Sequence, residues 1–264
     1  GMNLGNRPDA TLPDFGFRPI IVLVRTAHPG NLGAVCRAML NFGFTELRLI
    51  EPHCEVDEEA RKRAKFAGSI LDNVEIFENW DSCMQDIGLV IGTSGKKEGG
   101  LKTSFRHLIS PEEAASKAVQ HAGKVAIVFG EEGVGLSTPE LDLCDLLMTI
   151  NTWEGYPICN LSHAVALILY DFSRDETERS EEESLTGGVR KTLKKAISEY
   201  TNALSYEGTK SRMVGKTLDR IIMKGLPDDL EAQQLIGALV EATTALQKVS
   251  GDEEWKRGRR KRLE

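Results

Sequence analysis

The most informative segment of the sequence is Tyr156-Pro157-Ile158-Cys159-Asn160-Leu161-Ser162-His163-Ala164-Val165. It follows a short apolar run and a polar loop, and it leads directly into an apolar helix predicted to end near Phe172. A helix N-terminus carries free backbone N–H groups and is a common ligand site. The alternative is an ordinary helix cap, in which the Asn160 side chain accepts hydrogen bonds from the next turn. Two similar loops upstream favour the ligand site.

The chain has 264 residues, enough for one large domain and a small one. Its composition, 41% hydrophobic and 28% charged, is typical of a globular protein with a substantial core. Its 5 cysteines include no CxxC pair, which indicates free thiols rather than disulfides or a zinc site. The histidines are scattered singly, so we expect no metal. No apolar run approaches the length of a membrane span, and we expect a cytoplasmic protein without a membrane partner.

The formal net charge of -7 argues at first against a nucleic acid partner. Basic residues nevertheless gather at 61–65, at 96–106 and in the tail at 256–262. Most such clusters are solvated surface. Phosphate binding needs a local basic stripe and not a positive total, so an RNA partner stays open.

Short apolar runs alternate with helix-like segments between residues 19 and 172. The runs are rich in Val, Ile and Leu, which is typical of strands buried on both faces of a parallel sheet. We expect strands at 20–24, 47–50, 74–77, 89–91, 125–129 and 146–150. We expect helices at 32–42, 58–66, 111–121 and 137–144. The alternation predicts an α/β fold with an open, mostly parallel sheet and ligands at the carboxyl ends of its strands.

The sequence changes character after Phe172. Residues 173–188 are acidic and end in two glycines, which is typical of a linker. Helices are expected at 189–207, 209–223 and 228–250, the last started by Pro227-Asp228. The predicted organisation is an N-terminal tail at 1–18, an α/β domain at 19–172, an acidic linker at 173–188, and a small all-α domain with a basic tail at 189–264.

The loop after the first expected strand contains Pro29-Gly30-Asn31-Leu32-Gly33. Asn31 is a good N-cap for the helix that follows. The apolar stripe of that helix is predicted to face the sheet, which leaves Arg37 on roughly the opposite side. Arg37 is either an ordinary exposed arginine or a cation directed at a phosphate, a ligand or a partner subunit.

The loop after the fifth expected strand, residues 130–136, has three glycines that allow close approach of a ligand. It lacks the Lys-Ser/Thr of a P-loop and the glycine order of a dinucleotide site. Glu131 and Glu132 would repel a pyrophosphate, so a neutral nucleoside or a cationic ligand suits this loop better. Ser137 and Glu140 then form a predicted capping box. Thr93-Ser94-Gly95 ends the fourth expected strand in a third loop of this kind.

Three ordered segments, 31–37, 129–136 and 156–162, resemble the three motifs of the SPOUT superfamily. More narrowly, they are similar to its SpoU/TrmH branch of RNA ribose 2'-O-methyltransferases. The sequence around the third motif is closest to the TrmJ type. Enzymes of that type methylate the ribose of a pyrimidine at the 5' side of the tRNA anticodon loop.

The resemblance implies a C-terminal trefoil knot in the α/β domain, a homodimer and S-adenosylmethionine as cofactor. It implies that the cofactor is bound by Thr93, Ser94, Gly95, Gly130, Ile150, Pro157, Ile158 and Cys159. It assigns catalysis and substrate positioning to Asn31, Arg37 and Asn160. The chain departs from the family at Ile158-Cys159-Asn160, where Ser-Leu-Asn is common. That change removes one serine hydroxyl and leaves backbone contacts in place.

Methyl transfer from a sulfonium to a ribose oxygen requires alignment of the reacting atoms and removal of the hydroxyl proton. The resemblance gives proton removal to Arg37, but arginine is a poor base with a pKa above about 12. Arg37 could instead orient the hydroxyl and stabilise the forming alkoxide. The expected substrate is tRNA. The alternatives are the same reaction on ribosomal RNA, and a non-catalytic RNA-binding or cofactor-sensing protein.

Overall fold

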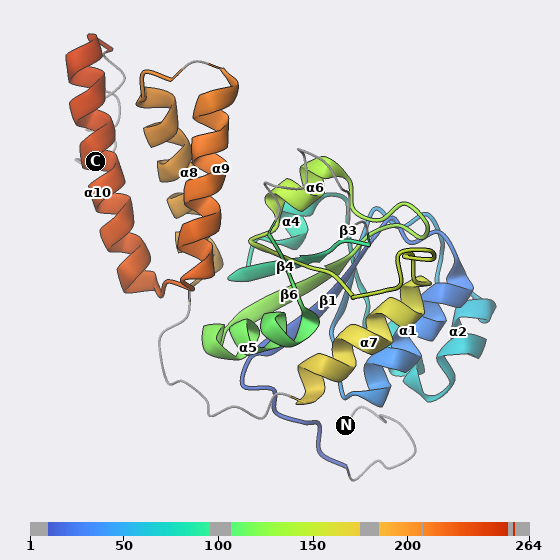
Figure 1. The fold of residues 1–264 in the computed structure, drawn as a ribbon. Coiled ribbons are helices and arrows are strands. Elements are labelled where there is room, and N and C mark those ends of the chain that lie inside the picture. Colours follow the sequence, from blue (N-terminus) through green and yellow to red (C-terminus); the bar gives the residue numbers. More distant parts are fainter. Residues whose placement is uncertain (1–9, 96–106, 175–184, 207, 253–255, 257–264) are drawn as a thin grey trace. The chain divides into compact units, whose positions relative to one another are not determined.

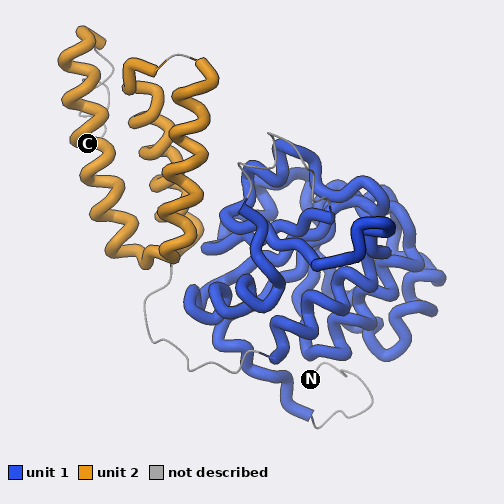
Figure 2. Tube along the Cα trace, in the orientation of Figure 1, with its two compact units in different colours: residues 1–182 blue, residues 183–264 orange. Residues whose placement is uncertain are grey.

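The computed structural model describes residues 10–95, 107–174, 185–206, 208–252 and 256. The chain forms two compact units, residues 1–182 and 183–264, coloured separately in Figure 2. Each unit is described by itself. The basic segment at 96–106 and most of the tail at 256–262 lie outside the described residues, as does the interior of the predicted linker.

The first unit is built on an all-parallel sheet in the order β3-β2-β1-β6-β4-β7-β5. Its strands are β1 (Arg18–Val24), β2 (Leu47–Ile50), β3 (Glu75–Phe77), β4 (Leu89–Thr93), β5 (Leu108–Ile109), β6 (Lys124–Phe129) and β7 (Leu146–Met148). The predicted α/β class and parallel sheet are confirmed. The two-residue strand β5 was not predicted, because so short a run carries no apolar pattern.

Helices cover both faces of this sheet, as Figure 1 shows. They are α1 (Pro29–Asn41), α2 (Glu58–Ala64), α3 (Gly68–Asp72), α4 (Trp80–Cys83), α5 (Pro111–His121), α6 (Thr138–Leu143) and α7 (Leu161–Arg174). A 3₁₀ turn at Lys65–Ala67 joins α2 to α3. Figure 1 places α1, α5 and α7 over one face and α4 and α6 over the other.

Strand β1 shows why the apolar runs contain no polar alternation. Ile20, Val22 and Val24 pack into the cluster that includes Cys83 of α4 and Leu141 of α6. The intervening residues Ile21 and Leu23 point to the opposite face and are equally buried. The strand is therefore apolar on both sides, as the sequence predicted.

The start of α1 corrects one prediction. The N-cap is His28, and Pro29 occupies the first helical position. Proline is favoured there because its fixed φ suits the helix and its missing N–H would have no partner. Asn31 therefore lies within the first turn and is not the cap. Its side chain is free to reach another loop.

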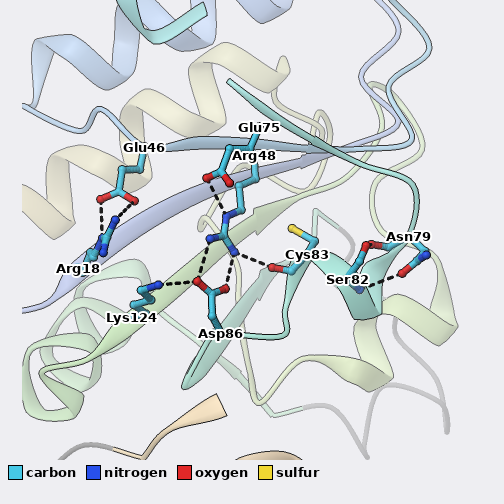
Figure 3. Close-up of polar contacts among 9 residues, drawn as sticks. All are labelled: Arg18, Glu46, Arg48, Glu75, Asn79, Ser82, Cys83, Asp86 and Lys124. Carbon is cyan, nitrogen blue, oxygen red and sulfur yellow. Dashed lines mark hydrogen bonds and ion pairs between the residues drawn. The ribbon is translucent and has the colours of Figure 1, made fainter. Parts of the chain in front are cut away.

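Ion pairs fasten the amino ends of the strands, at the edge opposite the loops of interest (Figure 3). The buried Arg48 of β2 donates to the carbonyl of Cys83 and, through two nitrogens, to the carboxylate of Asp86. Lys124 of β6 also pairs with Asp86. These two cations, Arg48 above all, outweigh partial burial and hold the pKa of Asp86 well below its usual range.

The second unit consists of α8 (Gly187–Ala203), α9 (Thr209–Lys224) and α10 (Asp229–Ser250). Helix α8 packs against both others. Asp228 and Glu231 form a capping box at the start of α10, which confirms the start signal read at Pro227-Asp228. Helices α7 and α8 take up the first and last residues of the predicted linker. In the described part of the chain no helix is long and apolar enough to cross a membrane.

Candidate functional site

Strands β1, β6, β4 and β7 are neighbours in the sheet, so the loops that leave their carboxyl ends emerge side by side. A cavity of about 360 Å³ lies at this edge. Its walls come from the ends of β4, β6 and β7, the loops that follow them, and the first turns of α7. The loops at 93–95, 130–136 and 156–160, all singled out in the sequence, thus meet at one site.

The cavity brings together all eight residues expected at the cofactor. They are Thr93, Ser94, Gly95, Gly130, Ile150, Pro157, Ile158 and Cys159. Asn160 also lines the cavity, whereas Asn31 and Arg37 do not. Apolar side chains such as Met148, Leu161 and Ile168 complete the wall. Of the residues predicted for catalysis, only Asn160 therefore faces the cavity of its own chain.

The loop after β6 is closed tightly on itself. The carbonyl of Glu131 accepts hydrogen bonds from the backbone N–H of Gly135 at 2.7 Å and of Val134 at 3.2 Å. A Cβ atom at Gly130 would lie 2.1 Å from the carbonyl carbon of Gly135, a distance that no side chain tolerates. Gly133 and Gly135 adopt positive φ angles of 76° and 79°. The glycines are therefore required by the turn itself, and they bring backbone to the cavity wall.

The loop after β7 leads into α7 through Asn160. The Oδ1 atom of Asn160 accepts hydrogen bonds from the backbone N–H of Ser162 at 3.0 Å and from its hydroxyl at 2.8 Å. Asn160 therefore does cap the helix, as the plainer interpretation held. Its Nδ2 atom lies on the other side, 3.5 Å from Oδ1 of Asn31. Capping and a role at the site are compatible, because they use different atoms of one amide.

Glu132 is a site residue that sequence reasoning missed. Its carboxylate accepts hydrogen bonds from the backbone N–H of Ala27 at 3.0 Å and from Nδ2 of Asn31 at 3.3 Å. Asn31 in turn faces Asn160, so side chains from three loops form one connected series. The signal in the sequence is an acidic residue in a glycine-rich loop, which predicts a neutral or cationic ligand but gives no sign of a contact with Asn31.

Arg25 connects the first and second loops at their bases. It adopts a positive φ of 52°, and its guanidinium pairs with both carboxylate oxygens of Glu140, one of them at 2.9 Å. Its Nε atom lies 3.6 Å from Glu131. Burial opposes ionisation of Glu140, but its bonds with Arg25 and Ser137 prevail and keep its pKa below the usual value. Ser137 and Glu140 also complete the predicted capping box of α6.

Arg37 is exposed on α1, as predicted, and forms no hydrogen bond or ion pair with another residue that the structure describes. One turn earlier, Gly33 lets α2 approach closely, because a Cβ there would lie 2.8 Å from Cβ of Arg63. Residues four apart share one helix face, so Arg37 lies on the same face as Gly33. Arg37 and Arg63 are therefore exposed on the same surface. Lys62 and Lys65 are exposed nearby in the sequence of α2 and its following turn.

The chemistry of the wall limits the ligand. Among the residues that the structure describes, those lining the cavity include Glu131 and Glu132 but no lysine or arginine, so they offer a polyphosphate no counter-charge. Apolar side chains and open backbone suit a flat, neutral group such as a nucleoside. Across the described ranges, no group of three His, Cys, Asp or Glu side chains is placed to hold a metal ion.

Sequence comparison finds methyltransferases that are similar to this chain. The tRNA (cytidine-2'-O-)-methyltransferase TrmJ of Methanocaldococcus jannaschii is 44% identical over 151 residues, 57% of this chain and 65% of that protein. An uncharacterized tRNA/rRNA methyltransferase of Haemophilus influenzae is 39% identical, and the match covers 61% of its length. Both matches span less than two thirds of the relatives. The tRNA (cytidine/uridine-2'-O-)-methyltransferase TrmJ of Citrobacter koseri is 32% identical over 83% of this chain and 93% of its own.

A solved structure has the same architecture. TrmJ from Z. mobilis ZM4 superposes with a TM-score of 0.68 and 27% sequence identity, covering 84% of this chain and 97% of that one. A sequence model of the SpoU rRNA Methylase family matches residues 18–170, which include every strand of the sheet and the whole cavity wall. The chain therefore belongs to the SpoU rRNA Methylase family.

Proposed function

We propose that this protein transfers a methyl group from S-adenosylmethionine to a ribose 2'-hydroxyl of tRNA. The observation that carries the proposal is the single cavity lined by all eight residues expected at the cofactor. Family membership and the printed names of the TrmJ relatives support the reaction and the substrate.

The cavity suits the cofactor in charge and in shape. S-adenosylmethionine supplies a methyl group activated on a positively charged sulfur. Glu131 and Glu132 give the wall a negative charge that favours such a cation, and the apolar side chains accept the adenine ring. Gly130, Ile158 and Cys159 line the cavity, where their backbone groups would make the polar contacts to the cofactor. The Ser-to-Ile departure at Ile158 therefore removes a side-chain contact without closing the site.

Arg37 and the amides of Asn31 and Asn160 would position the acceptor hydroxyl. Arg37 would orient it and stabilise the negative charge that forms as its proton leaves. The series Glu132–Asn31–Asn160 would hold the two asparagine amides in fixed orientations. Arg37 and Asn31 do not line the cavity of their own chain, so we propose that the working enzyme is a homodimer in which Arg37 serves the partner's cavity.

The surface of α7 supports the dimer. Leu167 and Tyr170 of α7 are 49% and 50% exposed, and Tyr170 contacts Phe42 of α1 edge to face. A second copy would cover these side chains. We also propose, from the family, that the part of the chain that forms the cavity is threaded as a trefoil knot.

The RNA partner is supported by uncompensated positive charge. Arg37, Lys62, Arg63 and Lys65 are exposed and have no acidic partner among the described residues. The acceptor nucleotide would be a pyrimidine at the 5' side of the anticodon loop, and the helices of 189–264 with their basic tail would add RNA contacts. Such a reaction belongs in the cytoplasm, where tRNA is found.

The test is methyl transfer from tritiated S-adenosylmethionine by the full-length protein, with tRNA and ribosomal RNA as separate substrates. Label on tRNA supports the proposal. Label on ribosomal RNA alone would assign the substrate named in the family description instead. Cofactor binding without transfer to either RNA would indicate a non-catalytic protein.

A further inference from the structure

The loop between β7 and α7 carries large apolar side chains that are exposed to solvent. Trp153 is 76% exposed and Tyr156 is 79% exposed, and Ile158 is about half exposed. A single exposed apolar residue needs no explanation, but two exposed aromatic rings in one short loop beside a cavity do. Thr152, Tyr156 and Ile158 line that cavity, so Trp153 directly follows a residue of its wall.

Hydrogen bonds within the loop hold it in one shape. The hydroxyl of Thr152 donates to the carbonyl of Pro157 at 2.9 Å, which closes a ring around Trp153. Inside this ring the backbone N–H of Tyr156 donates to the carbonyl of Trp153 at 3.1 Å. Trp153 therefore lies in a turn that is closed by hydrogen bonds and not in an extended loop.

The position of Gly155 shows how the indole lies. A Cβ atom at Gly155 would be 2.4 Å from Cη2 of Trp153 and 2.7 Å from both Cζ2 and Cζ3, its two ring neighbours. A point in the ring plane beyond Cη2 would lie much farther from Cζ2 and Cζ3 than from Cη2. These nearly equal distances place Gly155 over the plane of the ring. One face of the indole thus rests on its own loop, and the residue's high exposure leaves the other face open.

We propose that the open face of Trp153 is a stacking surface for an unpaired nucleobase of the RNA substrate, next to the nucleotide that is methylated. The proposal rests on the proposed function. Single-stranded RNA is bound by stacking of its bases on aromatic side chains, and every base has a π-face. An indole beside the cavity would hold the loop of an RNA so that one ribose reaches the cofactor. Glycine at 155 is what permits this arrangement, because any side chain would displace the ring.

The experiment compares the full-length wild type with Trp153→Ala, Trp153→Phe and the control Ile76→Ala. Ile76 is 62% exposed on β3, at the opposite edge of the sheet from β7. Unfractionated tRNA is the RNA probe, and binding is measured by filter retention. Trp153→Ala is expected to weaken tRNA binding by about 5- to 150-fold, the usual effect of one stacked base, while Trp153→Phe retains most affinity. Both variants bind the product nucleoside S-adenosylhomocysteine like the wild type.

A spectroscopic arm reports on the ring itself. The chain has 3 tryptophans, so Trp80→Phe with Trp255→Phe leaves Trp153 alone. Its fluorescence should be quenched by tRNA in proportion to binding. A methylating wild type with unchanged tRNA affinity in Trp153→Ala would overturn the stacking surface alone. A monomeric Trp153→Ala beside a dimeric wild type would assign the ring to a second copy instead. A wild type that methylates no RNA would overturn the proposed function, and the stacking surface with it.

Discussion

The carboxylate of Glu132 lies 3.3 Å from the side-chain amide nitrogen of Asn31, across two loops that are 101 residues apart in the sequence. A carboxylate is only an acceptor, so it fixes which end of the Asn31 amide faces it. The Oδ1 atom of Asn31 is then turned toward Asn160. One acidic residue of the cavity wall thereby determines the orientation of two amides near the proposed acceptor.

Glu132→Gln should slow methyl transfer by about fivefold, since glutamine can present a donor where Asn31 needs an acceptor and one hydrogen bond is worth about 1 kcal/mol. Glu154→Gln is the control, because Glu154 is exposed on the loop between β7 and α7 and does not line the cavity. Single-turnover rates with tRNA measure the effect. Equal rates for the two variants would show that Glu132 does not position Asn31.

Gly130→Ala should abolish binding of S-adenosylhomocysteine. The added methyl group would lie 2.1 Å from backbone atoms of Gly135 and Leu136, so the loop must move, at a cost of about 1–3 kcal/mol or more. Gly95→Ala is matched to it, because Gly95 also lines the cavity but a new Cβ there has no atom of the described residues within 4 Å. Calorimetric titration and thermal melting compare the two. A Gly130→Ala protein that binds normally would mean that the loop is not the binding element.

The triple variant Lys62→Ala/Arg63→Ala/Lys65→Ala should bind tRNA more weakly and with a smaller salt dependence. Each lost phosphate contact lowers the slope of log affinity against log salt by roughly 0.7–0.9. Arg61→Ala is the control on the same helix, because Arg61 is already paired with Asp72 at 2.7 Å. Its slope should equal that of the wild type. An unchanged slope in the triple variant would assign these residues to solvated surface.

The ion pairs at the amino ends of the strands predict the response to acid. Because the pKa of Asp86 is depressed in the folded state, its contribution to stability is present above about pH 4, the ordinary value, and is lost as pH falls through the folded value. Asp86→Asn should lower the Tm at pH 7, and the difference from wild type should narrow toward pH 2. Asp72→Asn, which removes an exposed pair, should change the Tm little at any pH. A constant difference for Asp86→Asn would contradict the linkage.

Much of the fold could be predicted because it rests on local patterns. Strand β2 and helix α5 begin and end at the predicted residues, since a short run dominated by Leu and Ile and a Ser-Pro start are local signals. Helix α4 was missed because its four residues cannot show a helical period. The predicted cap at Asn31 was wrong because proline at the first helical position outweighed it.

The candidate site also has features that the sequence predicts and features that it does not. The three loops could be found from glycines and polar residues at the expected strand ends, and their motifs identified the family. The role of Glu132 could not be found, because its partners Ala27 and Asn31 are joined to it only by the neighbouring positions of β1 and β6 in the sheet. The roles of Arg37, Asn31 and Asn160 in catalysis stay predictions.

The most direct test of the central claim is the fate of tritium from labelled S-adenosylmethionine, with wild type and Arg37→Ala on tRNA. Truncation of the exposed Arg37 should change the free energy of unfolding by no more than about 0.5 kcal/mol, so lost activity would not reflect lost folding. The expected result is label on a pyrimidine ribose, which makes the adjacent phosphodiester resistant to alkali, and no label with Arg37→Ala. Label on a base, or an Arg37→Ala protein as active as wild type, would contradict it.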